Sequence, residues 1–195
     1  MYHACAVREK SSGEATRLKD KFLTLGAELI EKNEWKKLLQ LTELAAQEFD
    51  KATLNREMKK VGVVGEIYLK FNPFAHKHVL DWLMERGVEV VPPMLTDFFT
   101  QFFVNRKTKK NYMTDNDFIP NWIFDKIYFY LKKIVHLFDI AGSKFRYYIP
   151  FNDIFEEAEE GEKIINMNAQ FGEGWLLPAE IATYYKQGIH NVISL

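Results

Sequence analysis

The chain has 195 residues, and its 26 Lys and Arg residues against 27 Asp and Glu residues give a formal net charge of −1 at pH 7. Hydrophobic residues make up 47% of the chain, and Cys5 is the single cysteine. These values exclude a disordered chain, a disulfide framework and a cysteine-based metal site built by this chain alone. The near-neutral charge and the lack of a long apolar run argue against nucleic acid and membrane partners, so a cytoplasmic globular protein is expected.

The first part of the chain, residues 1–59, is predicted to be helical. Residues 14–32 place Leu18, Phe22, Leu25 and Leu29 at helical spacing, and residues 34–49 repeat such a pattern. The pattern predicts a helical hairpin or one long bent helix. No glycine- or proline-rich linker follows it, so this segment is expected to pack on the main domain.

The main domain, residues 60–195, begins with a strand–helix–strand pattern. Val61–Leu69 is a short, β-branched apolar run typical of a buried parallel strand, and Ala75–Arg86 has the apolar spacing of a helix. Gly87 stands where a helix C-cap belongs, and Val88–Val91 is predicted to be a second strand. This order indicates an α/β fold with a right-handed connection between parallel strands.

Two further strands are predicted near the end of the chain. Lys163–Met167 is a third strand candidate, a helix is expected from about Pro178 to Lys186, and Asn191–Leu195 is a fourth strand candidate. A sheet of four short strands with the last one at the chain end looks incomplete. We therefore expect a fragment of a longer protein, truncated at the C-terminal end of this domain.

An insertion of about residues 94–160 separates the second and third predicted strands and holds more than half of the chain's aromatic residues. It contains a long aromatic helix, Asn121–Asp139, which is either a core helix or one covered by a missing partner. Arg106–Lys110 is predicted to be a basic turn that is solvated or meets a phosphate or a partner protein. The acidic run Glu156–Glu162 closes the insertion.

Ligands of open parallel α/β sheets bind outside the carboxyl ends of the strands, which selects candidate residues without any motif. Glu66 is either a ligand-facing acid or an ordinary capping carboxylate. The glycine loop after the third predicted strand either approaches a ligand closely or forms a plain turn. The residues selected by this rule are Glu66, Lys70, Asn72, His76, Asn168, Gln170, Gly172, Glu173, Gly174 and Trp175.

Motifs for other chemistry are missing from the sequence. It has no phosphate-binding loop, and Gly62-Val-Val-Gly65 lacks the third glycine of the dinucleotide fingerprint. His76 and His78 are two residues apart, so their rings point to different sides of a helix. No nucleophile elbow of a hydrolase is found.

Several ordered strings resemble the 2-hydroxyacyl-CoA dehydratase family, most closely its acyl-CoA dehydratase activase-related members. These strings are Val7–Lys10, Val61–Ala75, Gly87–Pro92, Asp97-Phe-Phe, Gly172–Leu177 with Glu180, and Gly188–Val192. The resemblance implies flavodoxin-like α/β domains. Together with the sequence pattern, this gives the expected fold: a flavodoxin-like parallel sheet with flanking helices, an N-terminal helical hairpin and a helical aromatic-rich insertion. It also implies a cytoplasmic protein of anaerobic bacteria.

The resemblance further implies a parent protein that works with fused or separate ATPase and dehydratase modules, an iron–sulfur cluster and an acyl-CoA. This chain departs from that pattern because it lacks the ATPase motifs and the cluster cysteines, so no cofactor and no metal ligand are expected in the fragment itself. A role in a cofactor or substrate pocket is carried over to Glu66, Asn72, Gly172, Glu173, Gly174 and Trp175. No catalytic residue is assigned.

The resulting hypothesis is a fragment that is inactive alone and contributes a strand-end pocket for an iron–sulfur cluster or an acyl-CoA in its parent. The alternative is a non-catalytic scaffold that docks the ATPase module or a partner protein through the aromatic insertion.

Overall fold

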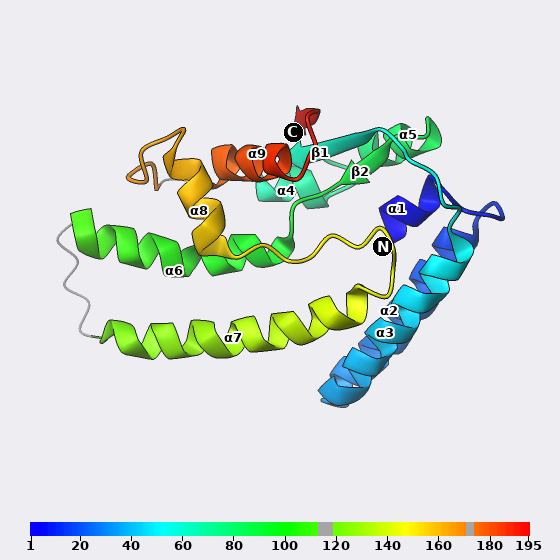
Figure 1. Ribbon diagram of the computed structural model, residues 1–195, viewed down its shortest axis with the longest axis horizontal. Coiled ribbons are helices and arrows are strands. Elements are labelled where there is room, and N and C mark those ends of the chain that lie inside the picture. Colours follow the sequence, from blue (N-terminus) through cyan, green and yellow to red (C-terminus); the bar gives the residue numbers. More distant parts are fainter. Residues whose placement is uncertain (113–118, 171–173) are drawn as a thin grey trace. The chain divides into compact units, whose positions relative to one another are not determined.

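The computed structural model describes residues 1–112, 119–170 and 174–195 (Figure 1). The chain forms two compact units. Unit 1 consists of Met1–Lys59, Met84–Glu89 and Tyr130–Phe151, and unit 2 consists of Lys60–Leu83, Val90–Phe129 and Asn152–Leu195.

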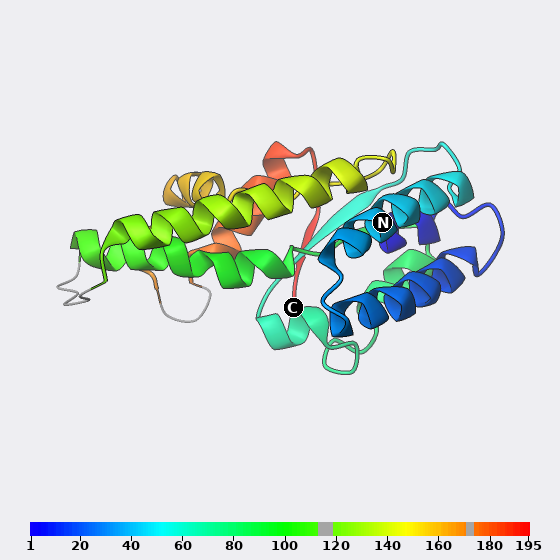
Figure 2. The ribbon, with the colours of Figure 1, turned by 90° about the horizontal axis from the view of Figure 1, so that it is seen from below.

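Unit 1 is built around a helical hairpin. Helix α1 (Tyr2–Ala6) is followed by α2 (Glu14–Glu31) and α3 (Trp35–Ala52), which lie side by side in Figures 1 and 2. Leu18 and Phe22 of α2 pack with Phe49 of α3 in one buried core. The turn between α2 and α3 places Asn33 at a φ of 54°. The prediction of a hairpin is confirmed, and the alternative of one bent helix is wrong.

The start of α2 is held by Glu9, which precedes it in the sequence. Its carboxylate accepts hydrogen bonds from the backbone N–H of Gly13 at 2.7 Å and of Ala15 at 3.0 Å. The first N–H groups of a helix have no partner within the helix, so a carboxylate at this position satisfies them and complements the helix dipole. Gly13 adopts a φ of 81°, which a glycine tolerates.

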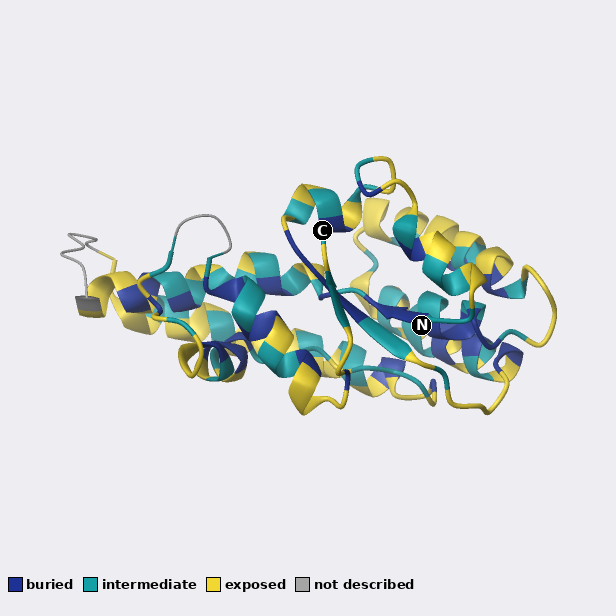
Figure 3. Ribbon diagram, turned by 90° about the horizontal axis from the view of Figure 1, so that it is seen from above, coloured by how far each residue is buried: buried dark blue, intermediate teal, exposed yellow. Residues whose placement is uncertain are grey.

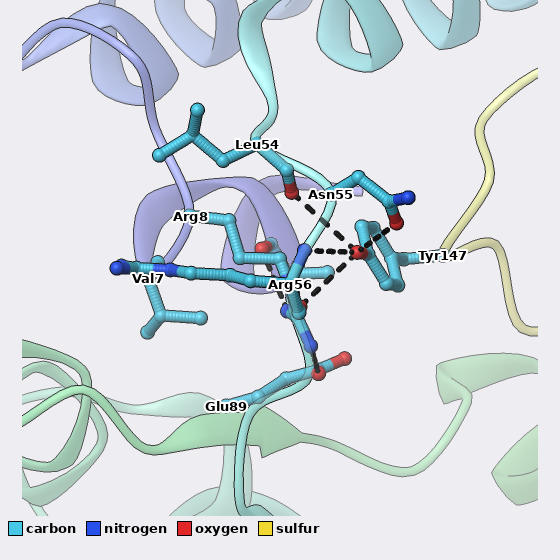
Figure 4. A network of polar contacts seen from close by, with 8 residues as sticks. Val7, Arg8, Leu54, Asn55, Arg56, Glu89 and Tyr147 are labelled. Carbon is cyan, nitrogen blue, oxygen red and sulfur yellow. Dashed lines mark hydrogen bonds and ion pairs between the residues drawn. The ribbon is translucent and has the colours of Figure 1, made fainter.

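A buried arginine ties three segments of unit 1 together (Figure 4). Arg8 is fully buried and donates to Arg56 O at 2.7 Å, to Ala4 O at 3.0 Å and to the Glu89 carboxylate at 2.7 Å. Its guanidinium also lies 4.0 Å from the centre of the Tyr147 ring. These bonds replace hydration that the guanidinium loses on burial, so removing one partner of the ion pair would leave a buried charge uncompensated.

Unit 2 is built on a small parallel sheet. Strand β1 (Lys60–Val64) lies between β2 (Glu89–Val91) and β3 (Val192–Ser194), and Glu89 itself is counted in unit 1. β1 and β3 are parallel, with Val63 opposite Ile193. Residues 62–64 and 89–91 are buried. Figure 3 colours buried residues dark blue and partly buried residues teal, and both colours occur in its strands. The prediction of an α/β fold with a parallel sheet is confirmed, whereas the flavodoxin-like arrangement stays a prediction.

The remaining helices of unit 2 follow the strands. Helices α4 (Ile67–Phe71) and α5 (Val79–Glu85) lie between β1 and β2 in the sequence, and α6 (Leu95–Tyr112) begins just after β2. The long helix α7 (Asn121–Gly142) confirms the predicted aromatic helix and contributes residues to both units. Helix α8 (Ile154–Glu162) contains the acidic run, and α9 (Leu176–Lys186) confirms the last predicted helix.

Three predicted elements differ in extent from the structure. The first strand ends at Val64 because Gly65 has a φ of 138° and Glu66 then starts α4. The helix predicted for Ala75–Arg86 shrinks to α5, since Lys77 and His78 have positive φ values of 51° and 55°. The basic segment Arg106–Lys110 is part of α6, so the predicted basic turn is wrong.

The third predicted strand, Lys163–Met167, is also wrong, because turns follow the end of α8 there. The backbone N–H groups of Ile164 and Ile165 both donate to Gly161 O at 2.9 Å and hold this turn. Gly161 itself sits tightly under α9, where an added Cβ would lie 2.8 Å from the Cβ of Ala179. The sheet therefore has three strands within the part of the chain that the structure describes. Across the same residues, no helix is long and apolar enough to cross a membrane.

Candidate functional site

The predicted residues after the first strand include a helix cap and a turn. The Glu66 carboxylate accepts a hydrogen bond from Leu69 N–H at 3.2 Å and so caps α4. The Asn72 side-chain oxygen accepts from Phe74 N–H at 3.0 Å and from Ala75 N–H at 3.3 Å. These contacts match the capping alternative for Glu66. Their predicted role in a ligand pocket stays a prediction.

The predicted glycine loop is only partly described. Gly172 and Glu173 lie outside the described residues, and Gly174 is half-buried at their border. Trp175 is 1% exposed in a core cluster of unit 2, where its indole N–H donates to the Asn105 side-chain oxygen at 2.6 Å. Trp175 therefore contributes to the stability of unit 2 through its packing in the core.

A different set of side chains meets inside unit 2, and it begins with a buried ion pair. Lys70 of α4 donates to Glu180 of α9 at 3.0 Å, and the two side chains are 2% and 3% exposed. Lys70 is one of the predicted strand-end residues. A buried pair of this kind needs favourable geometry, because both charges lose their hydration.

Asp97 and Glu157 are two further carboxyl groups that are buried near this ion pair. Burial raises the pKa of Asp97 in the first turn of α6 to about 7, although the Lys70 charge lowers it. Burial also raises the pKa of Glu157 on α8 to about 9, with the charges of Asp97 and Glu180 adding to the rise. Glu157 therefore keeps its proton at neutral pH, while Asp97 titrates close to neutrality. These three carboxyl groups and the lysine paired with one of them are called the carboxylate cluster below, and its members are Lys70, Asp97, Glu157 and Glu180.

The sheet and its connections bring the carboxylate cluster together. Lys70 and Asp97 lie on α4 and α6, the helices that begin just after the carboxyl ends of β1 and β2. Helix α9 is fixed on the sheet by Tyr184, whose hydroxyl donates to Val91 O at 2.9 Å and lies 3.3 Å from Val63 O.

The close approach of α9 depends on a glycine of β1. A Cβ at Gly62 would lie 2.6 Å from the Tyr184 ring, so only glycine allows this contact. Glu180 is one turn before Tyr184 on the same helix face, so the docking of Tyr184 also positions Glu180.

The carboxylate cluster contains a polar atom that packing alone does not explain. Within the described residues, Asp97 Oδ2 is buried without a hydrogen-bond partner, and a side-chain hydrogen bond with the Thr183 hydroxyl counteracts the rise in the pKa of Glu157. Leaving a buried polar atom unpaired costs free energy, and such exceptions concentrate at functional sites. A buried acid that titrates near neutrality is suited to accept or donate a proton.

Sequence reasoning located part of this cluster. Lys70 followed from the strand-end rule, and Asp97 and Glu180 stood in the strings that carry the family resemblance. Glu157 was missed as a site residue because it belongs to an acidic run that looks solvated, although it faces the interior of unit 2 and is 3% exposed. Its neighbours Glu156 and Glu159 are exposed on the same helix. The sequence offered one signal for this burial: on a helix, Glu157 lies next to Ala158, a small apolar residue that is buried.

An iron–sulfur cluster does not fit the side chains of this chain. Cys5 is fully buried in the core of unit 1, and burial raises the pKa of its thiol, whereas cluster ligands are thiolates. No group of three or more His, Cys, Asp and Glu residues suited to a metal ion occurs in residues 1–112, 119–170 and 174–195.

Comparisons with known proteins identify no relative. No protein-family model matches the chain, and neither the curated proteins nor the solved structures yield a match. The family resemblance therefore rests on the sequence strings alone.

Proposed function

We propose that this chain is a fragment of an activase-related or 2-hydroxyacyl-CoA dehydratase-like protein and that unit 2 contributes a strand-end site for an acyl-CoA in the cytoplasm of an anaerobic bacterium. The observation that carries the proposal is the carboxylate cluster, in which Asp97 and Glu157 are buried with raised pKa values. Two of its four members lie on helices that directly follow parallel strands. That is where open α/β sheets bind ligands.

The proposed role of the cluster is to hold and move protons beside a bound ligand. The Lys70–Glu180 pair supplies one positive and one negative charge, so the remaining two carboxyl groups are best accommodated in neutral form. A 2-hydroxyacyl-CoA has a hydroxyl group and a thioester oxygen that accept hydrogen bonds from such neutral acids. The chain alone is expected to bind without turning over substrate, and a flavodoxin-like parent with its own iron–sulfur cluster and ATPase module belongs to the same proposal.

Calorimetric titration with lactoyl-CoA tests this proposal. The intact chain is expected to bind it, and Asp97→Ala is expected to weaken binding about tenfold, because alanine removes the proposed hydrogen-bonding group. Glu159→Gln is the matched control, since Glu159 is an exposed acid on α8. Failure of the folded chain to bind lactoyl-CoA, or equal weakening by both variants, would overturn the proposal.

The scaffold alternative is favoured by a separate observation. Leu95, Phe99 and Phe102 follow each other at helical spacing on α6 and are 48%, 66% and 52% exposed. A stripe of exposed apolar side chains is typical of a surface that a partner protein covers. In this alternative, Phe99→Glu abolishes binding of a purified activase ATPase module to the immobilised chain and leaves the helical circular dichroism intact. Unchanged binding by this variant would exclude α6 as the docking face.

A further inference from the structure

A second site in unit 2 is separate from the carboxylate cluster. A cavity of about 390 Å³ lies among α6, the first two turns of α7 and the start of α8. This volume is near the lower end for small-molecule sites, which suits one compact ligand. The lining combines aromatic rings with charged and polar groups, contributed by Phe103, Arg106, Lys107, Asn121, Phe124, Asp125, Tyr128 and Phe155.

The aromatic side chains of the cavity are held in place by each other. The ring centres of Phe103 and Tyr128 are 5.1 Å apart, and those of Tyr128 and Phe155 are 5.0 Å apart in an edge-to-face arrangement. The Tyr128 hydroxyl donates to the Asp153 carboxylate at 2.8 Å, and burial with this bond raises the pKa of Tyr128. Tyr128 therefore stays neutral and presents its ring as part of a preformed apolar wall.

Two cationic side chains, Arg106 and Lys107, also line this cavity. The Arg106 guanidinium stacks 4.0 Å from the centre of the Phe124 ring and donates to Ile119 O at 2.6 Å, which fixes its plane. The Lys107 ammonium group is 5.4 Å from the centre of the Phe155 ring and is exposed. Asp125 is the one acid among the lining residues, so the described lining carries a net positive charge.

We propose that this cavity binds a nucleoside monophosphate. Aromatic walls favour a flat base that stacks on them, and base–aromatic stacking tolerates any base. The two cations favour the phosphate, which charge-assisted hydrogen bonds hold more strongly than neutral ones. An aliphatic anion would not use the rings, and an uncharged aromatic ligand would not use Arg106 and Lys107.

The test is calorimetric titration of the intact chain with adenosine 5′-monophosphate, adenosine and inorganic phosphate. The monophosphate is expected to bind with a Kd of about 100 μM or tighter, and the other two probes about tenfold more weakly. Arg106→Gln and Lys107→Gln are each expected to weaken monophosphate binding about tenfold. Lys109→Gln, an exposed lysine of α6 outside the cavity lining, is expected to leave it unchanged.

The proposal does not rest on the function proposed for the carboxylate cluster. The two proposals are tested with different ligands and different variants, so either one can fail without the other. Because Arg106 is buried, loss of binding in Arg106→Gln counts only when the circular dichroism of the variant matches the parent chain. Lys107→Gln keeps the test decisive if Arg106→Gln does not fold, because Lys107 is exposed. Adenosine binding as tightly as the monophosphate, no binding at about 5 mM, or equal binding by Lys107→Gln and Lys109→Gln would each overturn the proposal.

Discussion

Glu157→Gln tests whether the carboxylate cluster holds a proton in the folded protein. Burial raises the pKa of Glu157 from 4.5 to about 9 on folding. Between these two values the folded chain keeps the proton and the unfolded chain releases it. The free energy of unfolding therefore falls as the pH rises through this window, by about 1.4 kcal/mol per pH unit.

The size of the effect follows from that slope. From about pH 5.5 to about pH 7.5, Glu157 alone removes about 2.7 kcal/mol of stability from the parent chain. Asp97, whose pKa rises from 3.8 to about 7, acts in the same direction below pH 7 and remains in the variant. Glutamine has nearly the same shape and does not titrate. Glu157→Gln is therefore expected to lose about 2.7 kcal/mol less than the parent over this range.

Urea unfolding at a series of pH values, followed by tryptophan fluorescence, measures this difference. Glu159→Gln is the control because Glu159 is exposed on the same helix, and it is expected to keep the parent's pH dependence. A parent whose stability is constant or rises between about pH 5.5 and about pH 7.5 would refute the reasoning. So would a Glu157→Gln variant with the same slope as the parent.

Four further substitutions test the structural roles of individual residues by urea unfolding. Arg8→Ala removes one partner of the buried pair with Glu89 and is expected to destabilise the chain by about 3–5 kcal/mol, and a loss below 1 kcal/mol would contradict the network of Figure 4. Trp175→Ala empties a buried site and is expected to cost about 3–5 kcal/mol, whereas a small cost with lost lactoyl-CoA binding would favour the predicted pocket role. Asn72→Ala is expected to cost about 1 kcal/mol through its two lost hydrogen bonds to the following turn, and to leave lactoyl-CoA binding unchanged if Asn72 only holds this turn. Gly62→Ala drives a Cβ against the Tyr184 ring and is expected to cost about 1–3 kcal/mol, and a neutral effect would show that α9 does not pack as described.

The periodicity of apolar residues predicted those helices and strands whose tertiary contacts favour the same structure as the local sequence. The apolar spacing of α2, α3 and α7 and the short apolar runs of β2 and β3 predicted these elements close to their observed bounds, whereas the run predicted as the first strand extends beyond the end of β1. Lys163–Met167 failed because an apolar run this short is compatible with a strand and with a turn. The contact of Gly161 with Ala179, eighteen positions further along the chain, decides between them, and local spacing contains no information about it.

The basic segment Arg106–Lys110 shows a second limit of sequence patterns. A run of cations was read as a solvated turn, yet Arg106 and Thr108 are 9% and 7% exposed within α6. The long stem of an arginine covers apolar surface while its head keeps polar partners, here Phe124 and Ile119 O. Charge counting therefore assigned a loop where the side chain packs as part of a helix.

The carboxylate cluster shows why the strand-end rule finds a site only in part. The rule selects residues that follow strands, so it reached Lys70 on α4 directly. Glu157 and Glu180 come from α8 and α9, which the rule does not cover, and they reach the cluster because α9 docks on β1 through Gly62 and Tyr184. A charge that looks solvated in the sequence thus becomes buried through a tertiary contact. The pKa of such a residue, and with it the proposed proton chemistry, is a property of the packed helices and has no counterpart in residue spacing.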